Sequence, residues 1–199
     1  MPVAGYRPYD ARRAVSYERQ RADQPEWSRE RAIIAAAVAT MPAGATVLDV
    51  PVGTGRFLPL YADRGLRATG VDVSSDMLAE ARKKDLPVRL LTGDVTGDLL
   101  KLLGGFVDYS VCLRLINWLT PAEAERAIAQ LLRVTRTAVW VGLWSADTAG
   151  VKAASAETQA EGEVEGWVAA AGWSVAARHV LALGPIRVNA IWELRRAAR

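Results

Sequence analysis

The sequence predicts an α/β protein with a doubly wound sheet that is mostly parallel and ends in an antiparallel hairpin. Short apolar runs alternate with segments of helical period from residue 27 to residue 172, which is the rhythm of βα units. The last two runs, 173–183 and 186–196, alternate apolar and polar residues and are separated only by Gly-Pro. They must pair antiparallel, because a parallel crossover needs about a dozen residues or more.

The individual elements follow from the same patterns. Strands are expected at residues 46–50, 67–72, 88–92, 106–113 and 137–144. Helices are expected at residues 23–41, 55–65, 74–84, 120–134 and 163–172. Capping boxes are expected from Asp23 with Glu26 and from Thr120 with Glu123, and Gly65 is expected to end its helix.

Length and composition indicate one globular domain. The chain has 199 residues, of which 51% are hydrophobic and 24% charged, and this size suits one core with both faces of a sheet covered. We expect residues 26–199 to form a single domain and residues 1–25 to form a helical lid or a tail. The longest apolar stretch, 32–41, is well under the roughly 20 residues that span a bilayer.

Charge and cysteine content narrow the class of partner and the compartment. The net charge is +3, with charges of both signs scattered along the chain, so the support for a nucleic-acid partner is weak. The one cysteine, Cys112, and the lack of an apolar leader predict a cytoplasmic protein without disulfides. With one histidine and no cysteine cluster, no metal site is predicted.

The turn after the first strand is the expected ligand site, because doubly wound sheets bind ligands beyond the carboxyl ends of their strands. In LDVPVGTGRF (48–57), Gly53 and Gly55 would let main-chain amides approach an anionic group. Asp49 inside the strand is awkward beside a diphosphate but suits an ammonium group. A ligand with both a carboxylate and an ammonium group is an amino acid.

Two further acids follow the next two strands. Asp72 ends the second strand, where a carboxylate can accept both hydroxyls of a ribose. Asp94 ends the third strand and can accept a hydrogen bond from an exocyclic amine. Met77 opens the helix after Asp72, where its thioether can pack on a flat base. Amino acid, ribose and adenine, in that order, describe S-adenosylmethionine.

The segments VLDVPVGTGRF, GVDVSSDMLAEAR and GDV resemble the glycine motif, the acidic loop and the adenine-contacting motif of class I S-adenosylmethionine-dependent methyltransferases. The resemblance extends over about residues 27–195 and implies the seven-stranded, Rossmann-like fold of that family. It also implies that S-adenosylmethionine is the cofactor. One position departs from the family pattern, since Pro51 stands where glycine is usual, and we expect the turn to keep its geometry.

The resemblance assigns cofactor roles residue by residue. Asp49 and the backbone of the glycine turn would hold the methionine part, Asp72 the ribose, and Asp94 with Val95 the adenine, which Met77 would flank. The full implied cofactor-binding set is Asp49, Pro51, Gly53, Thr54, Gly55, Asp72, Val73, Met77, Asp94, Val95 and Leu113.

Simpler interpretations exist for single residues. The two glycines could form only a tight turn, Asp72 could only cap the following helix, and Met77 could be a core residue. A structural role is favoured for Asp108, and His179 in an alternating strand is better explained as a sheet residue than as a general base.

The chemistry needs little acid or base, because the methyl group on a sulfonium is already electrophilic and the enzyme mainly aligns the nucleophile. No catalytic residue is therefore identified. The segment LRLINWLT (113–120) lacks an Asn-Pro-Pro-Tyr motif, which disfavours methylation of a planar amino group on adenine or glutamine. The substrate-binding candidates are Arg114, Asn117 and Trp118, together with Tyr9, Arg13 and Tyr17 at helical spacing in the first 25 residues.

The predicted function is methyl transfer from S-adenosylmethionine to an oxygen, nitrogen or carbon nucleophile, most simply on a small molecule. A nucleobase, nucleic acid or protein acceptor is the alternative. A nicotinamide-dependent oxidoreductase is disfavoured because Leu58 stands where the third glycine of a dinucleotide motif belongs. A cofactor-binding protein without activity is the third possibility.

Overall fold

The computed structural model describes residues 10–146, 159–183 and 188–197. These residues form two compact units, one with the described residues up to Asp94 and the other with those from Val95 onward.

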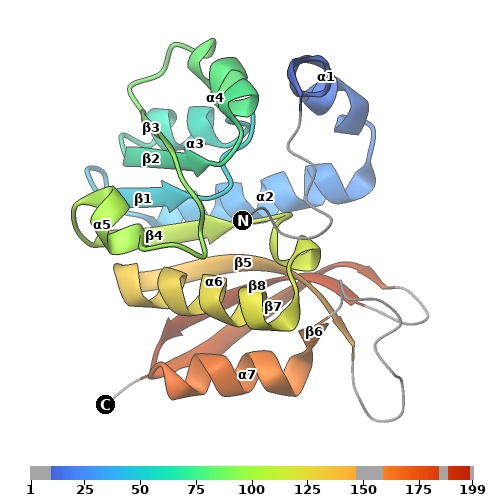
Figure 1. Ribbon diagram of the computed structural model, residues 1–199, viewed down its shortest axis with the longest axis vertical. Helices are drawn as coiled ribbons and strands as arrows, with labels where there is room; N and C mark the ends of the chain where they lie inside the picture. Colours follow the sequence, from blue (N-terminus) through green and yellow to red (C-terminus); the bar gives the residue numbers. More distant parts are fainter. Residues whose placement is uncertain (1–9, 147–158, 184–187, 198–199) are drawn as a thin grey trace. The chain divides into compact units, whose positions relative to one another are not determined.

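The first unit is built around three parallel strands in the order β3-β2-β1 (Figure 1). The strands are β1 (Thr46–Asp49), β2 (Arg67–Asp72) and β3 (Arg89–Thr92). Their register pairs Asp49 with Gly70 and Asp72 with Thr92, so the carboxyl ends of all three strands meet at one edge. Asp49 and Asp72, the acids at the ends of the first two strands, therefore lie at neighbouring strand ends.

Helices α3 (Leu58–Asp63) and α4 (Ser75–Arg82) connect these strands. α3 begins at Leu58, later than predicted, because residues 51–57 form a hydrogen-bonded turn. Gly65 follows α3 with a φ of +69°, as expected for a glycine that ends a helix. Ser74 caps α4 by accepting the amide of Met77 at 3.2 Å.

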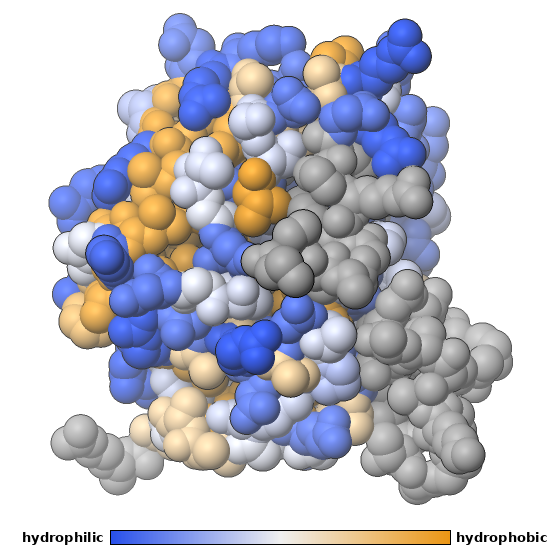
Figure 2. Space-filling model, in the orientation of Figure 1, coloured by the Kyte–Doolittle hydropathy of each residue, from blue (hydrophilic) through white to orange (hydrophobic). Residues whose placement is uncertain are grey.

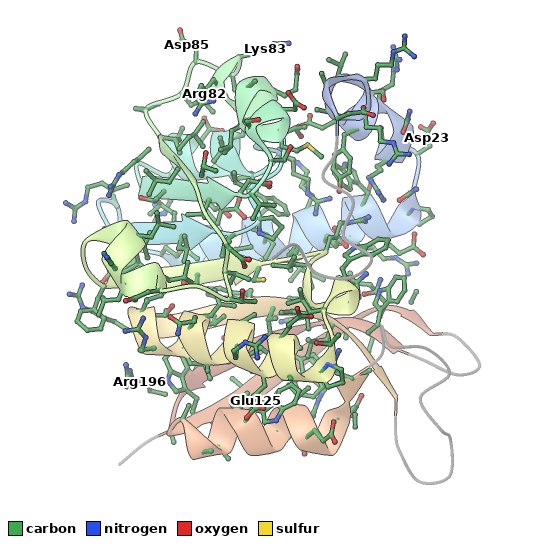
Figure 3. All side chains as sticks on the ribbon, viewed as in Figure 1. Asp23, Arg82, Lys83, Asp85, Glu125 and Arg196 are labelled. Carbon is green, nitrogen blue, oxygen red and sulfur yellow. The ribbon has the colours of Figure 1, made fainter. Side chains whose placement is uncertain are left out.

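Two helices precede the sheet, α1 (Ala11–Arg21) and α2 (Pro25–Thr40). Asp10 caps α1 by accepting the amide of Arg13 at 2.9 Å. The predicted capping box of Asp23 with Glu26 is wrong. α2 begins at Pro25, its N-cap is Gln24 without a side-chain bond, and Figure 3 shows Asp23 at the corner between α1 and α2, pointing outward. A proline suits the first helical turn because its missing N–H is not needed there.

The second unit has the strand order β4-β5-β8-β7. β4 (Val107–Cys112) and β5 (Thr135–Ala146) are parallel, whereas β8 (Val188–Arg196) is antiparallel to both β5 and β7 (Trp173–Leu183). The short β6 (Gln159–Ala160) pairs with the end of β5. The predicted C-terminal antiparallel hairpin is thus confirmed.

The helices of this unit are α5 (Leu99–Leu103), the 3₁₀ turn η1 (Ile116–Trp118), α6 (Pro121–Val134) and α7 (Glu161–Ala170). The predicted capping box of α6 is present, since the amide of Thr120 donates to Glu123 Oε2 at 3.0 Å. α5 was not predicted from the sequence. Asp98 caps it, and an ion pair of 2.6 Å with Arg133 lowers the pKa of Asp98.

The predicted fold class is confirmed: the chain is an α/β protein of the Rossmann-like, doubly wound class, mostly parallel with an antiparallel C-terminal hairpin. Fully buried side chains lie on strands of both units, for example Leu48 on β1, Val111 on β4 and Val139 on β5. Leu90 and Leu91 on β3 stay half-exposed, and Figure 2 shows hydrophobic surface over this strand.

Candidate functional site

The turn between β1 and α3 is held to β2 by hydrogen bonds. The amide of Val52 donates to the carbonyl of Val71 at 2.8 Å, and the amide of Gly53 donates to Asp72 Oδ2, also at 2.8 Å. Gly55 closes the turn by donating to the carbonyl of Val52 at 2.9 Å. Pro51 lies at the start of the turn, and its preceding peptide bond is cis.

The two glycines of the turn differ in their surroundings. Gly53 has a φ of +55°, and a methyl group built on its Cα would meet no atom within 4 Å. Gly55 has a φ of +78°, and the same methyl group would lie 2.6 Å from Leu58 Cδ1 and 3.2 Å from Ala81 Cβ. Gly53 therefore faces open space that a ligand could enter, whereas Gly55 allows α3 and α4 to pack closely on the turn.

Asp72 connects this turn to α4. Its Oδ2 accepts the amide of Gly53 and its Oδ1 accepts the amide of Ser74, both at 2.8 Å. Burial raises the pKa of Asp72, and the hydrogen bonds from Ser74 and Gly53 partly oppose that rise. Each carboxylate oxygen has a second lone pair, so the group can still accept hydrogen bonds from the hydroxyl groups of a ligand.

Asp49 is a second buried acid, 3% exposed, at the end of β1. Tyr61 of α3 donates its hydroxyl to Asp49 Oδ2 at 3.3 Å. Burial raises the pKa of Asp49 to about 7, although the Tyr61 hydrogen bond and the charge of Arg56 lower it. Tyr61 was not singled out from the sequence within the helix expected at 55–65; the available signal was that a buried tyrosine needs a hydrogen-bond partner.

α1 is attached to the glycine turn through Glu18. The hydroxyl of Thr54 donates to Glu18 Oε1 at 2.7 Å, and Lys84 Nζ lies 3.1 Å from the same oxygen. One carboxylate of α1 thus contacts both the turn and Lys84, which follows α4. Sequence reasoning missed Glu18 and Lys84, since neither has a local pattern that sets it apart.

Arg56, at the end of the turn, links it to α2. Its guanidinium lies 3.7 Å from the ring centre of Trp27 and 4.3 Å from that of Phe57, and it pairs with Glu30 at 2.5 Å. Tyr17 of α1 contacts Trp27 edge-on, with ring centres 5.8 Å apart. Stacked and charge-paired in this way, Arg56 fixes the position of α2 beside the turn.

The other predicted residues of the first unit are distributed as follows. Val73 is 42% exposed beside Asp72, Met77 is buried in the first turn of α4, and Asp94 is exposed after β3. Arg13 is exposed on α1, and Tyr17 is half-buried against Trp27. Tyr9 lies outside the described residues. The structure thus brings Asp49, Gly53 and Asp72 together, with Val73 at the rim, while Met77 lies in the interior.

The predicted residues of the second unit follow β4, except for Val95, which is buried at the start of the unit. Leu113 is buried against β5, where a methyl group on Gly142 would lie 3.2 Å from Leu113 Cδ2. Arg114 has a φ of +60°, which is unusual for a residue other than glycine.

Two polar or aromatic candidates lie in the 3₁₀ turn η1 after Arg114. Asn117 is buried and Trp118 is 45% exposed. A strained arginine and an accessible indole at the end of a parallel strand are features typical of a binding loop.

Metal-binding clusters and membrane-spanning helices are absent from the described part of the chain. It holds no group of three or more His, Cys, Asp or Glu side chains able to bind a metal ion. None of the helices in it has the length and apolar character needed to cross a membrane. Asp108 pairs with Arg136 at 3.5 Å, and His179 lies 3.8 Å from Glu193, so both have structural neighbours within the sheet.

Comparison with known proteins gives a consistent set of matches. Residues 47–138 match the family model described as methyltransferase domain. Malonyl-[acyl-carrier protein] O-methyltransferase of Pectobacterium atrosepticum is 36% identical over 101 residues, 50% of this chain and 38% of that protein. Phosphatidylethanolamine N-methyltransferase of Cereibacter sphaeroides is 56% identical over 99 residues, 47% of this chain and 46% of that protein. The matches thus span less than half the length of these curated relatives.

The fold also matches solved structures. Magnesium protoporphyrin IX methyltransferase from Synechocystis PCC 6803, with bound SAH, superposes with a TM-score of 0.70. The superposition covers 92% of this chain and 94% of that one, at 18% sequence identity. This likeness concerns the fold.

Proposed function

We propose that the chain is a class I S-adenosylmethionine-dependent methyltransferase, which the match of residues 47–138 to the methyltransferase-domain model supports. In this proposal it transfers the methyl group of S-adenosylmethionine to an oxygen, nitrogen or carbon atom of a small molecule. The observation that carries this proposal is the cluster of Asp49, Gly53 and Asp72 at the carboxyl ends of β1 and β2. It offers a carboxylate for an ammonium group, an open main-chain position, and a carboxylate for hydroxyl groups.

The residues present fit this cofactor. The open space at Gly53 admits the amino-acid end, and buried Asp49 supplies the negative charge that an ammonium group needs. Asp72 is already fixed by two amide bonds, so it can accept ribose hydroxyls without being reordered. Val73 and Asp94 would lie along the adenine, and Met77 would support it from the interior.

The bound cofactor would supply a methyl group on a sulfonium, which is a strong electrophile. The residues of the chain would then have to hold the acceptor in line and keep water out. α1 suits the second task, because Glu18 ties it to Thr54 of the glycine turn. We assign α1 as a cover of the cofactor, and Tyr17 as the residue that fixes it to α2.

For the acceptor, we propose Arg114, Asn117 and Trp118 as the residues that contact it. An arginine and an indole can bind an anionic or planar group, and Asn117 can orient it by hydrogen bonds. The names of the relatives, which mention a malonyl group on a carrier protein, phosphatidylethanolamine and magnesium protoporphyrin IX, favour an acceptor other than nucleic acid.

Two experiments test the function. Calorimetry should detect micromolar binding of S-adenosylhomocysteine and none of NADH, and the reverse preference would refute the proposal. Incubation of the chain and methyl-labelled S-adenosylmethionine with a fractionated cell extract should transfer label to a small-molecule fraction. Label found only in nucleic acid or protein would change the acceptor class, and cofactor binding without any transfer would indicate an inactive binding protein.

A further inference from the structure

We propose that Tyr61 is a positioning residue of the cofactor site, which holds the Asp49 carboxylate in the state and orientation that bind the ammonium group of S-adenosylmethionine and thereby makes cofactor capture depend on pH. This inference rests on the proposed function and deepens it. Tyr61 does not face the ligand itself; it acts through Asp49.

The geometry begins with two buried groups on neighbouring elements. Asp49 ends β1, and Tyr61 lies on α3, twelve residues later, with its hydroxyl 3.3 Å from Asp49 Oδ2. The side chain of Tyr61 is fully buried. Within the described part of the chain, its hydroxyl donates to the Asp49 carboxylate. A buried tyrosine hydroxyl is strongly constrained by its partner, and the carboxylate is oriented in turn.

The charges around Asp49 come from three elements. Arg56 in the turn lowers the pKa of Asp49, and Asp72 on β2 raises it. Arg56 is itself paired with Glu30 of α2, which reduces the positive charge that reaches Asp49. Burial remains the largest influence and raises the pKa of Asp49 to about 7.

The consequence for binding follows from this balance. Near neutral pH about half of the ligand-free molecules hold Asp49 protonated, and these must lose a proton to solvent before an ammonium group can bind well. The Tyr61 hydroxyl favours the ionised form by donating to it. Its removal should raise the pKa of Asp49, and a rise of one unit would cut the ionised fraction at pH 7 from about one half to about one tenth.

The experiment compares two nucleosides that differ only in the amino-acid end. S-adenosylhomocysteine carries the ammonium and carboxylate groups, whereas 5′-methylthioadenosine has the same adenine, ribose and thioether without them. Calorimetry from about pH 6 to pH 8.5 should show S-adenosylhomocysteine binding that strengthens with pH and 5′-methylthioadenosine binding that does not. In Tyr61→Phe, the Kd of S-adenosylhomocysteine should rise about fivefold at pH 7 and less than about twofold at pH 8.5.

Proton release is the second readout. Titrations in buffers of different ionisation enthalpy should show that S-adenosylhomocysteine binding at pH 7 releases about half a proton from the parent chain and about 0.9 from Tyr61→Phe. Asp49→Asn should release none, and this isosteric variant keeps the test open if Tyr61→Phe does not fold. Tyr109→Phe is the matched control: Tyr109 is a half-buried tyrosine of β4 whose ring lies tilted against that of Trp140, and its replacement should leave the binding of both nucleosides unchanged.

Three results would overturn the inference. Equal weakening of both nucleosides in Tyr61→Phe would show that Tyr61 only fills the core. A flat pH profile for S-adenosylhomocysteine in the parent chain would show that Asp49 does not exchange a proton on binding. Absence of binding of either nucleoside to the folded parent chain would refute the proposed function, and this inference with it.

Discussion

The main-chain amide of Gly53 donates to Asp72 Oδ2 at 2.8 Å and thereby joins the turn after β1 to the end of β2. The two residues were predicted separately, one for the amino-acid end and one for the ribose. Their hydrogen bond makes them parts of one unit, so a change in Asp72 should also disturb the turn that holds the other end of the cofactor.

Replacement of Asp72 by alanine should weaken S-adenosylhomocysteine binding by about 1 to 3 kcal/mol, because charge-assisted hydrogen bonds to the ribose are lost. The amides of Gly53 and Ser74 would lose their acceptors as well. Asp72→Asn keeps acceptor capacity and should lose less. Calorimetry on both variants checks the prediction, which an unchanged Kd for Asp72→Ala would contradict.

The two turn glycines should respond differently to alanine. Gly53→Ala places a methyl group in open space, so it should weaken cofactor binding at least about tenfold while lowering stability by only about 1 kcal/mol. Gly55→Ala forces Leu58 aside and should lower the free energy of unfolding by about 1 to 3 kcal/mol. Gly104→Ala, also at positive φ with no atom nearby, is the control for backbone strain. Equal losses of cofactor binding in Gly53→Ala and Gly55→Ala would contradict the assignment of Gly53 to the ligand and Gly55 to packing.

Loss of the Glu18–Thr54 hydrogen bond should speed release of the cofactor. Glu18→Gln and Thr54→Val should each raise the dissociation rate of labelled S-adenosylmethionine about threefold to tenfold, since a part-buried charge-assisted bond that holds α1 is weakened. The double variant should add little to the single ones, because both remove the same contact. Gln20→Ala, which removes a bond to Ser16 within α1, is the control. Additive rates would mean that the two residues act independently.

Asp49 should make the ligand-free protein less stable as pH rises. Its pKa is 3.8 in the unfolded reference and about 7 in the folded chain, so the folded state binds more protons between these values and stability falls across this window. Asp49→Asn removes the effect. Its free energy of unfolding should exceed that of the parent by up to several kcal/mol at about pH 8, and the difference should vanish near pH 4. Urea unfolding across this range measures the difference; a parent chain that is more stable than Asp49→Asn at pH 8 would contradict the assignment.

Arg114 should separate backbone strain from function. Arg114→Ala and Arg114→Gly both remove the side chain, but only glycine relieves the φ of +60°. The glycine variant should therefore be more stable than the alanine variant by about 1 kcal/mol, and both should lose methyl transfer. Thermal unfolding and a labelled-methyl assay test the two parts; full activity in either variant would remove Arg114 from the acceptor site.

Most of the fold could be predicted from local patterns, because apolar runs and capping residues act over a few positions. Element ends were less predictable. The fifth strand was expected at 137–144, yet β5 spans Thr135–Ala146 because β4 and β8 pair with it beyond its apolar stretch. α2 begins at Pro25, because a proline fits the first helical turn. The capping pattern predicted a start at Asp23 because it did not take this preference of proline into account.

The candidate site likewise contains residues that the sequence could predict and contacts that it could not. Asp49, Gly53 and Asp72 stand out because each lies at or just after the end of a strand that the sequence predicts. The contacts of Tyr61 with Asp49 and of Glu18 with Thr54 join residues 12 and 36 positions apart. Such pairs depend on how helices pack against the sheet, and that packing leaves no periodic trace in a single sequence.

Cys112 closes β4 and is fully buried. As the single cysteine of the chain, it gives the molecule a built-in thiol probe two residues before Arg114. A thiol reagent can modify it only in molecules whose β4 end has opened. The labelling rate therefore measures how often this end of the strand opens, and a ligand that closes it would be visible as slower labelling without any engineered reporter.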